Sequence, residues 1–200
     1  MIRRPAARFA AVVAAAMAIA SAGIVTAADS SGEARFDRVF PSIYTDLLFN
    51  SKNAYGDKRY DEAFPLVKKA ACAGDKESQW MLGHMYLLGQ GVARDDFTGY
   101  AWIKVAAEFS SHEYRSTVET IEKAIDPKQL PAVKAGARTF IDNYGLRATH
   151  MSCNLAASQH GHIMDHIVCT PKDDGQFWLL RQCVAETQEP APAPTTAPSR

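Results

Sequence analysis

Apolar residues between Phe36 and Gly145 recur every three or four positions and do not alternate regularly with polar ones. Phe64, Val67 and Ala71 have this spacing, which is the period of an α-helix that packs by one face. Turns rich in glycine separate such stretches, most clearly at Gly89-Gln90-Gly91. Glycine accepts the left-handed conformation that ends many helices. The pattern therefore predicts an all-α fold of helices joined by short turns.

Capping residues place some of the helix ends. Asp95 or Asp96 can cap the helix that follows the glycine turn. Asp126-Pro127 predicts the start of a later helix, with the aspartate as N-cap and the proline at the first helical position. Residues 143–145, Asn-Tyr-Gly, predict where that helix ends.

The chain resembles itself at a shift of 36 residues. Residues 68–71, Lys-Lys-Ala-Ala, then match residues 104–107, Lys-Val-Ala-Ala. The same shift places Phe64 on Tyr100. A period in the thirties indicates helix–turn–helix units stacked on one another.

The best-patterned unit resembles a known repeat. The run Ala63-x6-Ala70-Ala71-x2-Gly74, followed by Leu82-Gly83-x2-Tyr86-x2-Gly89-x-Gly91-Val92-x2-Asp95, is similar to the Sel-one-like repeat, a relative of the tetratricopeptide repeats. Tyr100-Ala101-Trp102-x3-Ala106-Ala107 resembles the opening of a second repeat. The resemblance implies a short α/α solenoid of helical hairpins, with the best repeat at residues 60–95 and a degenerate one at 96–145. Ala70, Ala71 and Gly83 then allow neighbouring helices to approach closely.

The chain outside this match also fits helices. Residues 114–143 fit two helices that form a degenerate terminal pair, as end repeats usually do. Residues 36–53 predict a further helix at the front, started or broken near Pro41. The helical repeat domain is thus expected to cover residues 29–145.

The family resemblance implies a non-catalytic scaffold or adaptor that binds another protein, with no cofactor. The sequence contains no Gly-x-Ser-x-Gly, His-Glu-x-x-His, Ser-x-x-Lys or Cys-x-x-Cys motif. Some cysteine-rich relatives have been linked to penicillin hydrolysis, so an envelope hydrolase is one alternative. Cys72 matches the first cysteine of such repeats, but no second one follows within the repeat. The contact face is expected on the groove side of the helix pairs, at Tyr60, Phe64, Lys68, Tyr100 and Lys104.

The amino terminus changes the interpretation of composition and charge. Residues 1–28 combine three arginines, an Ala-rich apolar stretch and small residues at Ala27 and Ala28, as secretory signal peptides do. The whole chain of 200 residues has 22 basic and 22 acidic side chains. Cleavage removes three arginines and no acid, so 19 basic groups face 22 acidic ones. The mature protein is then mildly acidic, which disfavours nucleic acid as a partner. It is expected in the bacterial periplasm or outside the cell, without stable membrane insertion after cleavage.

The segment 146–186 has a different character, because it is rich in cysteine and histidine. Exported proteins form disulfides readily. We expect Cys153 and Cys169 to close a small hairpin-like loop with residues 163–168 as its second strand. Cys183 either pairs with Cys72 or stays reduced, since four cysteines allow three pairings. Thr170-Pro171 predicts the start of a last helix whose apolar side chains, Phe177, Trp178 and Leu180, dock on the repeat.

The same segment supports a second alternative, a periplasmic metal-binding protein. His160, His162, His166 and a cysteine are of the types that bind zinc or copper. No single regular conformation aligns the three histidines well. The structural disulfide is therefore the favoured interpretation of the cysteines. Residues 187–200 are rich in proline and alanine and are expected to form a disordered tail.

Overall fold

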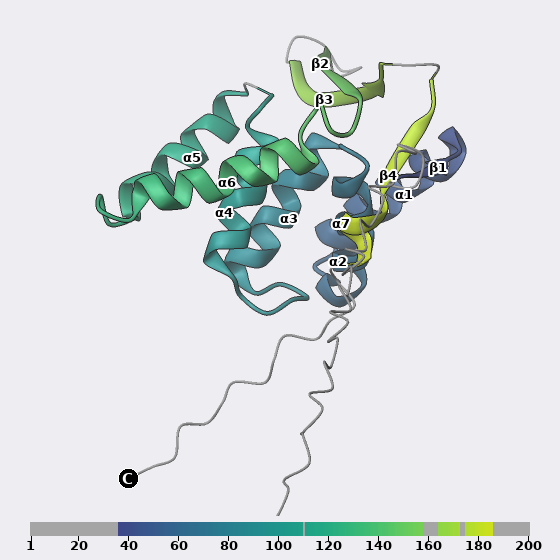
Figure 1. The fold of residues 1–200 in the computed structure, drawn as a ribbon. Coiled ribbons are helices and arrows are strands. Elements are labelled where there is room, and N and C mark those ends of the chain that lie inside the picture. The colour runs from purple at the N-terminus through teal and green to yellow at the C-terminus, as the bar shows by residue number, and fades with distance from the viewer. Residues whose placement is uncertain (1–35, 110, 158–163, 173–174, 186–200) are drawn as a thin grey trace, which may run out of the picture. The chain divides into compact units, whose positions relative to one another are not determined.

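Helices make up most of the described chain in the computed structural model, which describes residues 36–109, 111–157, 164–172 and 175–185. The predicted signal peptide and the Pro/Ala tail lie outside these residues. The elements follow the order β1 (Phe36–Val39), α1 (Pro41–Gly56), α2 (Tyr60–Cys72), α3 (Lys76–Leu88), α4 (Asp96–Ala106), α5 (His112–Ala124), α6 (Leu130–Tyr144), β2 (Met151–Ala157), β3 (Met164–Pro171), β4 (Phe177–Leu180) and α7 (Arg181–Ala185) (Figure 1).

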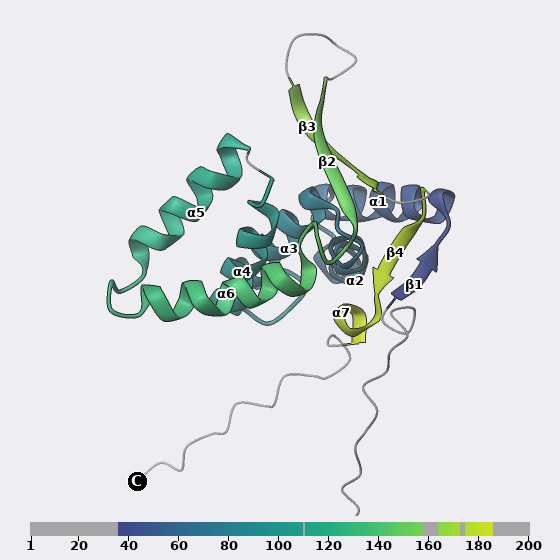
Figure 2. The same cartoon turned by 45° about the horizontal axis from the view of Figure 1, so that its top comes forward.

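The helices pack mainly on their neighbours in the chain. Helix α1 lies against α2, α2 against α3, and α3 against α4, while α6 packs on α4 (Figure 1). Helix α5 makes its main helix contact with α4 and diverges from α6 (Figure 2). The predicted arrangement of packed helix pairs is confirmed.

Small residues allow this close packing. A Cβ atom at Gly83 on α3 would lie 2.7 Å from Ile103 Cγ1 and 2.9 Å from the Gly99 carbonyl oxygen on α4. The two helices therefore approach nearly to backbone contact. Ala70 and Ala71 of α2 are fully buried in the same way. Distances this short leave no room for a larger side chain at Gly83.

Most predicted helix ends are confirmed. Gly89 ends α3 in the left-handed region with φ 67°, and the Asp95 carboxylate accepts a hydrogen bond from the Thr98 N–H at 3.0 Å at the start of α4. The prediction for Asp126 is wrong, because α6 begins only at Leu130, with Gln129 as its N-cap. The Asp126 carboxylate instead accepts from the Lys128 N–H at 2.8 Å. That local bond stabilises a turn before the helix.

Two short antiparallel sheets accompany the helices. Strand β1 pairs with β4, so that Phe36 lies opposite Leu180 and Val39 opposite Phe177. Residues 36–39 are thus a strand, and the front helix begins at Pro41. The prediction of a last helix through Phe177, Trp178 and Leu180 is also wrong. These apolar residues suit a strand once β1 provides a pairing partner, and only the short α7 follows them.

The expected hairpin disulfide is present, and the Cys72–Cys183 pairing that the sequence left open is formed. Cys153 on β2 is bonded to Cys169 on β3, and Cys72 at the end of α2 is bonded to Cys183 on α7. Cys72 and Cys183 are both buried in a core that also contains Trp102 and Tyr144. Among the described residues, no helix is long and apolar enough to cross a membrane.

Candidate functional site: a pocket between α4, α5 and α6

The predicted contact residues on α2 lie at two different depths. Tyr60 and Phe64 are half-buried, and Phe64 meets Tyr86 edge to face with ring centres 5.6 Å apart. Lys68 is only 5% exposed. Lys68 is therefore a packing residue in this fold, and the expectation that it projects from the surface is wrong. Tyr60 and Phe64 are partly exposed, and their place on a contact face stays a prediction.

The predicted residues on α4 lead towards α5. Tyr100 is 1% exposed, and its hydroxyl donates a hydrogen bond to Glu122 Oε1 at 2.8 Å. Lys104 is half-buried, with its Nζ 3.5 Å from the same carboxylate oxygen. Tyr100 is thus a buried residue and does not project from the surface as expected. The sequence pattern gave no sign of Glu122, whose role depends on how α5 lies against α4.

Glu122 joins three helices through its carboxylate. Besides its contacts with Tyr100 and Lys104 on α4, it lies 2.6 Å from Lys134 Nζ on α6. Burial alone would raise the pKa of Glu122, but the hydrogen bonds from Lys134 and Tyr100 and the nearby lysine charges outweigh it and hold the pKa below its ordinary value. Burial and the adjacent carboxylate raise the pKa of Tyr100. The ionised Glu122 thus stabilises the position of α5.

A pocket opens beside this cluster, where α5 diverges from α6. Its volume is about 580 Å³. Side chains from α3, α4, α5, α6 and the turns between them line it, and these are Leu87, Arg94, Asp96, Phe97, Tyr100, Thr120, Ile121, Ala124, Ile125, Asp126, Gln129 and Val133. Of the five contact residues predicted from the sequence, Tyr100 is the one that contributes to this lining.

The chemistry of the pocket is mainly apolar. Phe97 lines the pocket and is 42% exposed, although its ring also meets that of Phe140 edge to face. Two of the three charged lining residues are paired with each other, since Arg94 Nε donates to Asp96 Oδ1 at 2.7 Å, while the Asp126 carboxylate accepts from the Lys128 N–H. An apolar cavity with a few polar groups at its edge is typical of sites that take up an apolar ligand group. The sequence signal for Phe97 is limited to a large apolar residue in the first turn of a helix.

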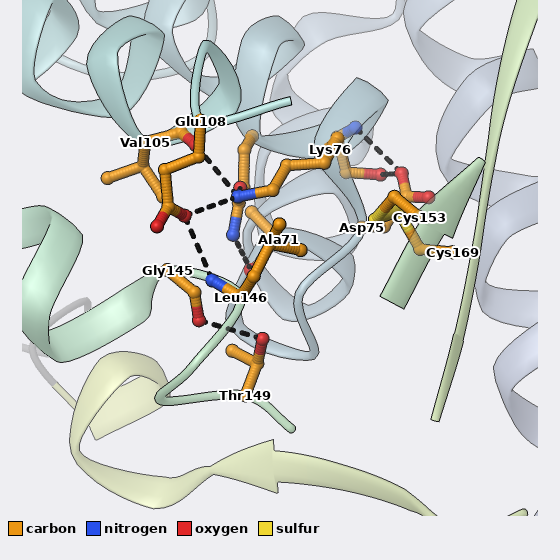
Figure 3. Close-up of a disulfide and its surroundings, with 12 residues drawn as sticks. Ala71, Asp75, Lys76, Val105, Glu108, Gly145, Leu146, Thr149, Cys153 and Cys169 are labelled. Carbon is orange, nitrogen blue, oxygen red and sulfur yellow. Dashed lines mark hydrogen bonds and ion pairs between the residues drawn. A yellow bond between two sulfur atoms is a disulfide. The ribbon is translucent and has the colours of Figure 1, made fainter. Parts of the chain in front are cut away.

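A second cluster, around Lys76, is the most deeply buried charged group in the described chain. Lys76 Nζ donates to Gln79 Oε1 at 2.9 Å, to the Val105 carbonyl at 2.7 Å and to Glu108 Oε2 at 2.9 Å (Figure 3). The same glutamate oxygen accepts from the Leu146 N–H at 2.9 Å. Burial lowers the pKa of Lys76, and the Glu108 carboxylate partly offsets this.

The geometry around Lys76 indicates a structural role. An ammonium group has three protons, and each finds an acceptor here. The cluster ties the start of α3 to the end of α4 and to the segment after α6 (Figure 3). A lysine with all its donors engaged has none left for a substrate, so the pocket is the better candidate site.

The structure describes only some of the residues of the predicted metal site. His160 and His162 lie outside the described residues, and His166 lies in β3 with its side chain not described. All four cysteines are in disulfides, so the expected thiolate ligand is ruled out in this form. The part of the chain with described side chains contains no group of three residues suited to hold a metal ion.

Comparisons with known proteins add one similarity. No protein-family model matches the chain, and no curated protein sequence matches it. Among solved structures, it is similar to the crystal structure of c5321, described as a protective antigen present in uropathogenic Escherichia coli strains and displaying an SLR fold. The sequence identity is 25% and the TM-score is 0.42. The match covers 54% of this chain and 23% of that one, so it spans less than a quarter of the length of c5321.

Proposed function

We propose that this protein is a non-catalytic binding protein of the bacterial cell envelope, and that its pocket between α4, α5 and α6 holds an apolar side chain of a partner protein. The observation that carries the proposal is the pocket itself, with its mainly apolar lining and the Arg94–Asp96 pair at its rim. Both disulfides support a location where oxidation is favoured.

The size of the pocket suits this role. Ligand sites usually enclose about 300–1,000 Å³, and the pocket falls within that range. In protein interfaces, a few apolar or aromatic anchors buried in such pockets supply most of the binding energy. A rim pair such as Arg94 and Asp96 adds little affinity of its own when exposed to solvent. We therefore expect the partner to contribute a large apolar anchor.

A photo-crosslinking experiment tests the proposal. A photoreactive amino acid is placed at Thr120, which lines the pocket, or at Glu119, which is exposed on the same helix and does not line it. We expect crosslinking to a discrete envelope protein from position 120 and much less from position 119. The bound protein is then identified by mass spectrometry.

A pocket-filling variant provides the second arm. Ala124→Trp places an indole in the pocket, whereas Lys123→Trp places one on the neighbouring exposed position. We expect the Ala124→Trp change to abolish the crosslink from position 120 and the Lys123→Trp change to preserve it. Equal crosslinking from positions 119 and 120, or a crosslink that survives Ala124→Trp, would refute the pocket as the binding site.

A further inference from the structure

The β2–β3 hairpin extends away from the helices (Figure 2), and in the described part of the chain β2 pairs with another strand along one edge only. Within the described residues, β3 is the one strand that pairs with β2. Its base is fixed, because Met151 and Cys169 are buried in a core beside α1, α3 and α5. Farther along, Leu155 is 40% exposed and Val168 is 41% exposed. The hairpin thus presents a free strand edge with exposed apolar side chains.

The pairing pattern shows which backbone groups face outward. The Lys172 N–H donates to the His150 carbonyl at 2.9 Å, which makes these two residues a hydrogen-bonded pair of the antiparallel ladder. Such pairs alternate with non-hydrogen-bonded ones. Cys153 and Cys169 are therefore a non-hydrogen-bonded pair, in agreement with their short Cα–Cα distance of 4.0 Å. Hence the N–H and C=O groups of Cys153 and Leu155 point away from β3.

This edge lacks the usual protection against pairing. Natural edge strands commonly have lysine, proline or other charged residues that discourage another strand. Strand β1 has such charges at Asp37 and Arg38. Strand β2, by contrast, reads Met-Ser-Cys-Asn-Leu-Ala-Ala and contains no charge and no proline. A neutral strand can pair with its own copy without placing like charges opposite each other.

We propose that β2 is a self-association edge, which pairs antiparallel with β2 of a second copy of this chain about a two-fold axis at Asn154. In this register each Cys153 lies opposite Leu155 of the other copy. Cys153 and Leu155 of the two copies together present four outward N–H groups and four outward C=O groups, and all of these find partners. A centre at Cys153 would require the Met151 N–H, which already donates to the Leu146 carbonyl at 3.1 Å. A centre at Leu155 would require the ladder to continue through the irregularity between Ala156 and Ala157.

The side chains fit the same arrangement. Asn154 would face Asn154 of the other copy in a non-hydrogen-bonded pair, where side chains come closest and two amides can bond to each other. Leu155, now exposed, would be flanked by Cys153 of the other copy on the same face. The result is a four-stranded sheet with the order β3–β2–β2–β3, which is isologous as a two-fold interface must be.

Charge substitution at the axis tests the proposal on the full chain as the cell processes it, with both disulfides formed. Sedimentation velocity over a range of concentrations measures self-association. We expect the wild type to form dimers. Asn154→Lys and Asn154→Asp should each weaken dimerisation at least about tenfold, since like charges then meet at the axis. An equimolar mixture of the two variants should restore dimers, because opposite charges then meet.

Matched controls separate the edge from general effects of charge. Thr170→Lys and Thr170→Asp change an exposed residue on β3, away from the axis, and should leave dimerisation within about twofold of the wild type. Circular dichroism verifies that every variant is folded. A monomeric wild type, dimers that resist both Asn154 changes, or a mixture that fails to restore them would each overturn the proposal. The Ala124→Trp pocket variant should still dimerise, so this test is independent of the pocket.

Discussion

The α2–α4 helices and the C-terminal arm, defined here as residues 146–185, are held in place by different means. Between α3 and α4 the backbones nearly touch at Gly83 and Gly99, so many weak contacts share the stabilisation. The arm is instead attached through a few strong links, which are the Cys72–Cys183 disulfide, the β1–β4 pairing and the Glu108–Leu146 bond. The Cys153–Cys169 disulfide closes the hairpin within the arm itself.

This difference has a consequence for how each region fails. Close helix packing is damaged by adding atoms, whereas the arm is damaged by removing a single link. The two regions also differ in reach along the chain. The helices contact their sequence neighbours, but Cys72 and Cys183 are 111 residues apart. The predictions below test this contrast, beginning with the largest expected effect.

Removal of the long-range disulfide should have the largest effect. The Cys72→Ala/Cys183→Ala double variant reopens a loop of about 110 residues in the unfolded chain, and loop-closure entropy for this length gives a loss of about 4–5 kcal/mol in the free energy of unfolding. Urea denaturation followed by circular dichroism measures it. A loss below about 1 kcal/mol would contradict the role given to this link.

Loss of the buried ammonium group should rank second. Lys76→Met removes the partner of a carboxylate in a mostly buried pair, which typically lowers stability by about 3–4 kcal/mol. Glu108 keeps its bond to the Leu146 N–H, so the fold should survive. The matched control is Lys52→Met, which breaks the more exposed pair with Glu77 and should change stability by less than about 1 kcal/mol. Equal losses in the two variants would refute a special role for Lys76.

The hairpin disulfide should matter less and more locally. Cys153 and Cys169 are 16 residues apart, and the Cys153→Ala/Cys169→Ala variant should lose about 3 kcal/mol. Hydrogen exchange followed by mass spectrometry should show the largest increase in β2 and β3. If native-state protection falls equally in α2, α3 and α4, the arm and the helices behave as one cooperative unit and the contrast is wrong.

Added volume at the closest helix contact should have a moderate effect. Gly83→Ala places a methyl group 2.7 Å from Ile103 and 2.9 Å from a backbone oxygen, so the helices must move apart at a cost of about 2 kcal/mol. Gly56→Ala is the control, because nothing lies within 4 Å of its added Cβ atom. Thermal unfolding of both variants provides the comparison. A stabilised Gly83→Ala variant would show that the contact is looser than described.

The smallest effect is expected at Glu122, and it depends on pH. Glu122→Gln should lose about 1.5 kcal/mol at pH 7, since hydrogen bonds to a charged group are weakened. The pKa of Glu122 is lowered in the folded protein, so its contribution is present above the ordinary value of 4.5 and is lost as pH falls through the folded value.

The stabilities of the wild type and the Glu122→Gln variant should therefore begin to converge as the pH falls below about 4.5, and should meet once the pH is below the lowered pKa of the folded protein. Denaturant titrations at several pH values measure the difference. The control Glu119→Gln, at an exposed position of the same helix, should stay within about 0.5 kcal/mol of the wild type at every pH. A constant difference between wild type and Glu122→Gln across the pH range would contradict the ionised bridge.

Local chemistry explains which features could be predicted from the sequence. The helical period, the glycine at position 89 and the capping Asp95 depend on residues within one or two turns of each other, and the structure confirms them. The Cys153–Cys169 bridge was predictable because the two residues are close in the chain. Asp126 was misleading, since a short bond to its own neighbourhood competes with helix capping.

The candidate site depended on less local information. The repeat pattern marks Tyr100 and Lys104 as positions on one helix face, but it does not show whether another element covers that face. Helix α5 brings Glu122 onto both residues and buries Tyr100. The pocket arises because the same helix then diverges from α6, and no property of α5 alone encodes that direction.

The sequence by itself thus determined the helical repeat, its small-residue contacts and one of its two bridges, because each follows from spacing along the chain. Only the tertiary structure decided that Phe177–Leu180 is a strand, that Cys183 bonds to Cys72 and that a pocket lies beside α5. The physical reason is the same in each case. A strand, a long-range bridge or a pocket wall needs a partner from a distant segment, and packing of the whole chain selects that partner.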